Sequence, residues 1–173
     1  AIVEEKNPEM DEATKARVAQ AIGVGAVKYA DLSQNRMSDY VFSYDKMLAL
    51  SGNTAPYLIY AYVRVQSIAR KGGIDWESVD GSAIDSLATP EEFDLARALI
   101  RLPETLALVE ADLAPNRLTD YLYDLSQVFS RFYTNNRVLG DPRQTTRLAL
   151  CDLASRTIRQ GLDLLGIKVI EEM

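Results

Sequence analysis

The sequence predicts an all-α protein, on the evidence of two patterns. Apolar residues recur at spacings of three and four along most of the 173 residues, whereas the alternation of a half-buried strand is scarce. Proline and glycine also divide the chain into segments of ordinary helix length. With 47% apolar and 25% charged residues, the chain has the composition of a globular protein that forms one domain, or one domain with part of a second.

The first third of the chain predicts two helices joined by a loop. The first helix begins near Asp11 and runs toward Tyr29, although its two internal glycines each disfavour a helix by roughly 1 kcal/mol. Its expected apolar face consists of Val18, Ile22 and Ala26. Residues 32–43 are rich in Ser, Asn and Asp and predict a loop, and residues 44–50 predict a short helix.

The middle of the chain predicts a capped helix followed by an acidic connector. Thr54 is the expected N-cap, Pro56 lies in the first turn, and a glycine pair at 72–73 ends the helix. Its expected buried stripe consists of Leu58, Ala61, Val65 and Ile68. Residues 74–90 carry several carboxylates, and their length predicts a mobile connector.

Two further helices and a strongly amphipathic third follow the connector. Thr89 is the expected cap of the first, and Pro103 separates it from the second. The third has the clearest helical period in the chain, carried by Leu118, Leu122, Leu125, Phe129 and Phe132.

The last helix is predicted to begin with Asp141 as its cap and Pro142 in its first turn. Its expected buried residues are Cys151, Ala154, Ile158, Leu162 and Leu165. Gly166 ends the helix and leaves residues 167–173 as an extended tail.

Missing residue types exclude much catalytic chemistry. Without histidine and with one cysteine, Cys151, the chain cannot form a Ser-His-Asp or Cys-His site, or a zinc site of the usual nitrogen and sulfur ligands. Neither glycine-rich phosphate-binding motif is present. Adjacent carboxylates such as Glu91 and Glu92 point in different directions on a helix, so we expect them to be solvated surface charges. No metal or cofactor is expected.

The hydropathy pattern favours a soluble, cytoplasmic protein. No apolar run approaches the roughly 20 residues of a membrane-spanning helix, and no leader sequence is evident.

Three blocks of sequence occur in this order: AVKYADLSQNRMSDYVFSYDKMLALSGNTAPYLIYAYVRVQSIARK, LTDYLYDLSQVFSRFYTNNRVLG and RLALCDLASRTIRQGLDLLGIKVIEEM. Together they resemble the C-terminal end of the arginyl-tRNA synthetases, and the resemblance covers essentially the whole chain. It implies a helical bundle of the class I anticodon-binding type. Residues 1–47 would be the end of the catalytic region with a connecting helix and loop, and residues 48–173 a DALR-type anticodon-binding domain.

The resemblance implies a C-terminal fragment that recognises tRNA and lacks the active site. The family's ATP-binding signatures, of the H-I-G-H and K-M-S-K-S type, lie upstream of this region. The parent enzyme would attach arginine to its tRNA with ATP as a substrate, and this chain alone would be inactive. The implied partners are the tRNA for arginine and the upstream catalytic domain, in a monomer that binds neither DNA nor membrane.

The resemblance also suggests tRNA contacts. Positions matching Tyr133, Arg137 and Met173 border the anticodon loop in the family, and residues 32–38 match a loop that approaches tRNA. Helical spacing places Tyr133 off the buried stripe and Arg137 one turn further on the same side, although Tyr133 could instead support the bundle. The candidate tRNA-binding residues are Tyr133, Arg137, Met173, Gln34, Asn35, Arg36 and Arg131.

Residues 57–71 raise two interpretations that the sequence leaves open. This segment places three tyrosines beside three basic residues: Tyr57, Tyr60 and Tyr62 with Arg64, Arg70 and Lys71. The rings can pack the helix with their hydroxyls at the surface. Alternatively, they can border a path for RNA, where arginine binds phosphate and rings stack on unpaired bases.

Net charge weighs against RNA binding, but its distribution matters more. The chain carries a net charge of −6, with acids concentrated in residues 4–12 and 75–94. The last third holds an arginine run that predicts an electropositive face: Arg131, Arg137, Arg143, Arg147, Arg156 and Arg159. The alternative function is a helical adaptor that binds protein partners through the acidic connector and helix grooves.

Overall fold

The computed structural model describes residues 9–84 and 86–171, and within these residues all regular elements are helical. The α-helices are α2 (Glu12–Leu32), α3 (Tyr44–Met47), α4 (Ala55–Gly72), α5 (Pro90–Leu99), α6 (Leu102–Asp112), α7 (Asn116–Asn135) and α8 (Gln144–Leu164). Two 3-10 turns, η1 (Trp76–Ser78) and η2 (Gly81–Ala83), lie in the connector. The all-α prediction is confirmed.

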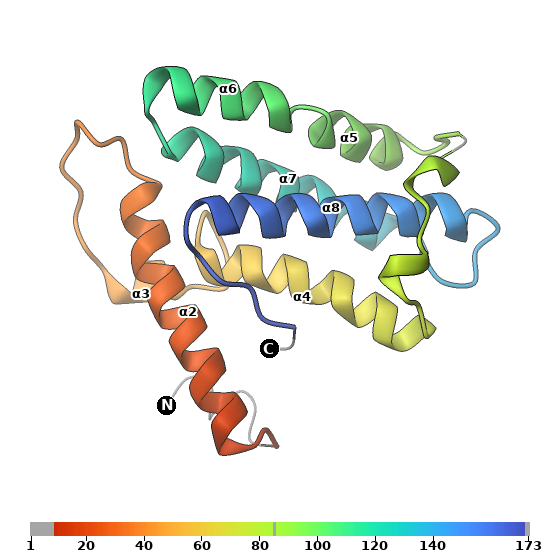
Figure 1. The fold of residues 1–173 in the computed structure, drawn as a ribbon, viewed down its shortest axis with the longest axis horizontal. Helices are drawn as coiled ribbons and strands as arrows, with labels where there is room; N and C mark the ends of the chain where they lie inside the picture. The colour runs from red at the N-terminus through yellow and green to blue at the C-terminus, as the bar shows by residue number, and fades with distance from the viewer. Residues whose placement is uncertain (1–8, 85, 172–173) are drawn as a thin grey trace.

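Three long helices form the centre of the bundle. Figure 1 shows α4, α7 and α8 side by side, with α5 and α6 along the outer side of α7 and α2 crossing one end. Their shared core contains Leu58, Ile59, Leu122, Leu125, Phe129, Ile158 and Leu162, all fully buried. Helices α7 and α8 approach closely at Gly161, where an added Cβ would lie 2.5 Å from Leu122 Cδ2.

Local signals place most helix starts correctly. Thr54 caps α4 by accepting a hydrogen bond from Tyr57 N, as predicted. Thr89 caps α5 and forms a reciprocal capping box with Glu92. The predicted buried faces of α4 and α7 are confirmed, because every stripe residue named for these helices is buried.

The predicted start of the last helix is wrong by two residues. Helix α8 begins at Gln144 and has no side-chain cap, so Pro142 does not occupy its first turn. Asp141 instead holds the preceding turn, in which its Oδ1 accepts a hydrogen bond from Arg143 N at 2.9 Å. Its other oxygen, Oδ2, pairs with Arg147 Nη1 at 3.1 Å. The short helix predicted over residues 44–50 also ends early, at Met47.

Glu92 is a buried charge rather than the surface charge that its sequence context predicted. Its side chain is 0% exposed and lies between two arginines, with Arg143 Nη2 at 3.0 Å and Arg147 Nε at 2.8 Å. It also accepts backbone hydrogen bonds from Ala88 N at 2.7 Å and Thr89 N at 3.3 Å. Burial alone would raise the pKa of Glu92, but these partners lower it to about 2.

This carboxylate joins segments that are distant in the sequence. Arg143 Nη2 also donates to Ser86 O in the connector, and Arg147 Nη1 donates to Arg137 O after α7. The start of α5, the connector, the α7–α8 loop and the first turn of α8 therefore meet around one negative charge.

We predict that Glu92→Gln destabilises the fold by about 3 kcal/mol at pH 7, because it removes the buried carboxylate that Arg143 and Arg147 share and leaves Arg147 with the partly exposed Asp141 as counter-ion. The folded-state pKa of about 2 lies below the ordinary value of 4.5. The ionised carboxylate therefore stabilises the fold above about pH 4.5, and this contribution is lost as the pH falls toward 2. Urea unfolding of the wild type and the variant across this pH range measures both effects.

Glu110→Gln, at an exposed carboxylate on α6, is the matched control. Equal unfolding midpoints for the Glu92 and Glu110 variants at pH 7 would contradict a stabilising role for the buried charge.

Candidate nucleic-acid interface

A mixed aromatic and basic surface is formed between α4 and α7. The Arg64 guanidinium lies 4.5 Å from the centre of the Tyr133 ring and 5.7 Å from that of Tyr60. Tyr133 is half-buried and stacks on Phe129, with ring centres 6.2 Å apart and ring planes 29° apart. Tyr60 is 43% exposed. We call Tyr60, Arg64 and Tyr133 the aromatic–arginine face.

The other two tyrosines of α4 are packing residues. Tyr57 is half-buried, its ring meets Tyr123 edge-on at 5.7 Å, and its hydroxyl lies 3.4 Å from Ser130 Oγ. Tyr62 is 3% exposed and donates to Glu171 Oε1 at 2.9 Å. Burial and this carboxylate raise the pKa of Tyr62 to about 12. The packing interpretation therefore holds for Tyr57 and Tyr62, and Tyr60 is the exposed ring of the three.

The C-terminal tail is fastened along α4. Lys28 Nζ of α2 donates to Gly166 O at 2.6 Å, where the tail leaves α8. Arg70 Nη1 then donates to Glu171 O at 2.8 Å, beside the bond from Tyr62. Met173, a candidate tRNA contact, lies outside the described residues.

Arg137 does not continue the helical register of Tyr133, so the helical spacing that placed it one turn further on the same side does not apply. Helix α7 ends at Asn135, and its C-cap, Asn136, is extended, with φ −125° and ψ 124°. The exposed Arg137 side chain turns back along the following loop, where its Nε donates to Leu139 O at 2.9 Å. The loop after α7, and not helical spacing, sets the direction of this guanidinium.

The three candidates from the first loop are engaged within the chain. Gln34 Nε2 donates to Ser33 Oγ at 3.2 Å, and Asn35 Oδ1 accepts from Met37 N at 3.0 Å. Arg36 Nη1 donates to Leu113 O at 3.0 Å, just before α7 begins. Tyr133 lies near the other end of α7, about 25 Å away at 1.5 Å per residue. The structure therefore separates the loop candidates from the aromatic–arginine face.

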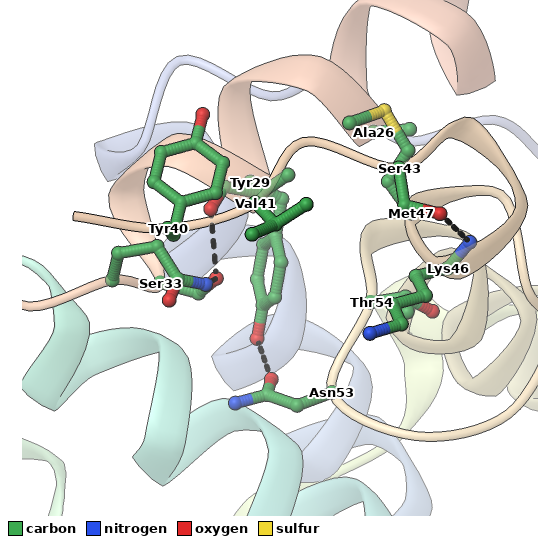
Figure 2. Close-up of a pocket in the computed structure, with 12 residues that line it drawn as sticks. Ala26, Tyr29, Ser33, Tyr40, Val41, Ser43, Lys46, Met47, Asn53 and Thr54 are labelled. Atoms are coloured by element: carbon green, nitrogen blue, oxygen red, sulfur yellow. Dashed lines mark hydrogen bonds between the residues drawn. The ribbon is translucent and has the colours of Figure 1, made fainter.

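A cavity of about 130 Å³ lies behind this loop, between α2, α3 and residues 53–54. Figure 2 shows Tyr29 reaching Asn53 beneath the segment that carries Tyr40 and Val41. The Tyr29 hydroxyl lies 2.5 Å from Asn53 Oδ1 and 2.9 Å from Thr119 O, and burial raises the pKa of this phenol. The hydrogen bonds of Tyr29 at the floor of this cavity therefore connect α2 to the rest of the bundle.

The predicted arginine-rich face does not form as one surface. Arg143 and Arg147 bind the buried Glu92, and Arg156 pairs with Asp152 at 2.9 Å. Arg131 is exposed and lines a shallow groove of about 260 Å³ between α5 and α7, shared with Arg101 and Asp124. The basic groups of the last third are therefore divided between structural and surface positions.

Residues 9–84 and 86–171 contain neither a candidate membrane-spanning helix nor a candidate metal site. No helix there combines the length and apolarity needed to cross a lipid bilayer. The same residues hold no group of three or more His, Cys, Asp or Glu side chains placed to bind a metal ion.

Comparison with known families identifies the bundle. Residues 58–173 match the DALR anticodon binding domain, and residues 1–44 match the catalytic domain of class I tRNA synthetases of the arginine type. The chain belongs to the DALR anticodon-binding domain family.

Curated relatives carry the name arginine-tRNA ligase. The Synechocystis sp. protein is 58% identical over 161 residues, which is 92% of this chain and 27% of that protein. The Synechococcus sp. protein is 56% identical, over 99% of this chain and 30% of its own length. The chain thus spans under a third of these relatives.

Solved structures agree with this grouping. Arginyl-tRNA synthetase from Plasmodium falciparum superposes with a TM-score of 0.87 at 34% identity, over 99% of this chain and 30% of that one. The Thermus thermophilus enzyme gives a TM-score of 0.85, also at 34% identity and with the same coverage.

Proposed function

We propose that this chain is the tRNA-recognising part of an arginine-tRNA ligase. In this proposal residues 48–173 bind the anticodon region of the arginine tRNA, and residues 1–47 connect them to the upstream catalytic domain. The aromatic–arginine face carries the proposal, because an exposed ring, a guanidinium and a second ring are arranged on adjoining helices. The family match over residues 58–173 supports it.

The face has the chemistry needed for unpaired bases. Tyr60 and Tyr133 offer ring surfaces on which bases can stack, and Arg64 between them can stack on a base or bind phosphate. Phe129 supports Tyr133 from below, so the ring is ordered before a ligand arrives. Arg131 and Arg137 are also exposed, but Arg131 lines the groove between α5 and α7 and Arg137 lies in the loop after α7.

The parent enzyme in this proposal uses ATP as a substrate and acts as a cytoplasmic monomer that binds neither DNA nor membrane. Met173 and the loop residues Gln34, Asn35 and Arg36 remain candidate tRNA contacts. Since the loop lies about 25 Å along α7 from Tyr133, we assign it to a different part of the tRNA from the anticodon bases.

We predict that the chain binds an arginine tRNA transcript with a strong dependence on salt. With about three or four phosphate contacts, each contributing roughly −0.7 to the logarithmic slope, affinity should fall about 20- to 50-fold between 50 and 200 mM salt. Gel shifts or fluorescence titrations across this range measure the slope. A helical adaptor would not bind the transcript. An affinity that does not depend on salt would contradict the electrostatic account.

Tyr133→Ala should weaken binding of the transcript about ten- to a hundredfold, because it removes one stacking surface. Tyr133→Phe retains the ring and is the matched control, with an affinity expected within about twofold of the wild type. Since Tyr133 also packs on Phe129, thermal midpoints are measured for both variants. Unchanged tRNA affinity with a large drop in midpoint for Tyr133→Ala would make this tyrosine a packing residue.

The chain alone should not support arginine-dependent ATP–pyrophosphate exchange, because it lacks histidine and both phosphate-binding glycine motifs. A full-length arginine-tRNA ligase serves as the positive control in the same assay. Exchange above the blank by the purified chain would show that it holds a nucleotide site of its own.

A further inference from the structure

The loop after α7, residues 136–140, presents Arg137 although it contains little regular structure. Two of its residues are anchored inward: Asn136 is 5% exposed and Val138 is 5% exposed. Asn136 Nδ2 donates to Phe132 O at 3.0 Å, and its Oδ1 accepts from Thr89 Oγ1 at 3.0 Å. Between these anchors, Arg137 is exposed.

The side chain of Arg147, which is buried, binds the Arg137 backbone. Arg147 Nη1 donates to Arg137 O at 2.8 Å, and the same nitrogen lies 3.1 Å from Asp141 Oδ2. The Nε of Arg147 is fixed by Glu92 Oε1 at 2.8 Å, so the direction of the donor is set from α5. A side chain that is 7% exposed and bound through both Nε and Nη1 of its guanidinium group has little rotational freedom.

The Arg137 side chain is shaped by the same loop. Its Nε donates to Leu139 O, and its guanidinium passes over Gly140. A Cβ at Gly140 would lie 3.2 Å from Arg137 Nη2, and the φ of 69° there favours glycine. Backbone and side chain of Arg137 are therefore ordered in advance of any ligand.

We propose that Arg147, oriented by Glu92, is a positioning residue for RNA binding: it fixes residues 136–140 and thereby holds the Arg137 guanidinium toward the nucleic acid. Arg147 does not itself touch RNA in this proposal. The inference rests on the proposed function, since it requires Arg137 to meet the tRNA. The sequence alone placed Arg147 in an electropositive face. In this proposal Arg147 is buried and acts on RNA binding indirectly.

Arg147→Lys tests the link, because lysine keeps the charge beside Glu92 but lacks the forked donor that also reaches Arg137 O. Arg143→Lys is the matched control, since Arg143 binds the same carboxylate but donates to Ser86 O at the other end of the network. We expect Arg147→Lys to weaken binding of the arginine tRNA transcript about fivefold, the effect of one hydrogen bond, and Arg143→Lys to change it less than twofold.

A double-mutant cycle with Arg137→Ala separates positioning from simple destabilisation. If Arg147 acts through Arg137, Arg147→Lys should have no further effect on tRNA affinity once Arg137 is alanine, while it still lowers the urea midpoint. Equal losses of affinity in both backgrounds, or equal effects of the two lysine variants, would overturn the proposal.

Two further measurements keep the outcomes distinct. If Arg147→Lys does not fold, Asp141→Asn is the alternative variant. Asp141 is 25% exposed and pairs with the same Nη1 of Arg147, so its substitution should weaken the restraint on that donor. We expect it to weaken tRNA binding about twofold, and only when Arg137 is present. If Arg137→Ala binds tRNA as tightly as the wild type, the positioning role is wrong, while the transcript titration of the wild type still decides the proposed function. If the wild type itself does not bind the transcript, the proposed function fails as well.

Discussion

The charge on Glu92 is the constraint on which one end of the bundle depends. A carboxylate removed from water must be matched by donors, and Arg143, Arg147 and two backbone N–H groups supply them. Each arginine also reaches a backbone carbonyl, Ser86 O or Arg137 O, in a segment that lacks regular structure. One buried charge therefore orders both the end of the connector and the loop that follows α7.

The proposed function requires an acidic chain to present a surface suited to RNA. The net charge of −6 is an average, and binding depends on which charges are exposed together. Arg143 and Arg147 are used inside the fold, whereas Arg64 lies between two tyrosine rings and Arg137 stands on an ordered loop. A few well-placed guanidinium groups can act locally even where the total charge is unfavourable.

Hydrogen bonds also connect residues 1–44 and residues 58–173, the two segments that match different family models. Helix α2, within the catalytic-domain match, is bound to the bundle by Tyr29, whose buried hydroxyl meets Asn53 and Thr119. Lys28 ties α2 to the start of the C-terminal tail, and Arg36 ties the following loop to Leu113. Residues 12–36 are thus structurally part of the helical bundle, and the position of the aromatic–arginine face is fixed relative to α2.

Local physics determined much of this protein from its sequence alone. The helical class, the Thr54 and Thr89 caps and the apolar stripes of α4 and α7 follow from backbone hydrogen bonding and helical periodicity, which act over a few residues. The burial of Glu92, the role of Arg147 and the exposure of Tyr60 rather than Tyr62 were decided only by tertiary packing. Each depends on partners 50 or more residues away, or on which helix lies opposite. The sequence does not distinguish a charged or aromatic side chain that contacts water from one that contacts a distant residue. Only the tertiary structure determines which of the two occurs.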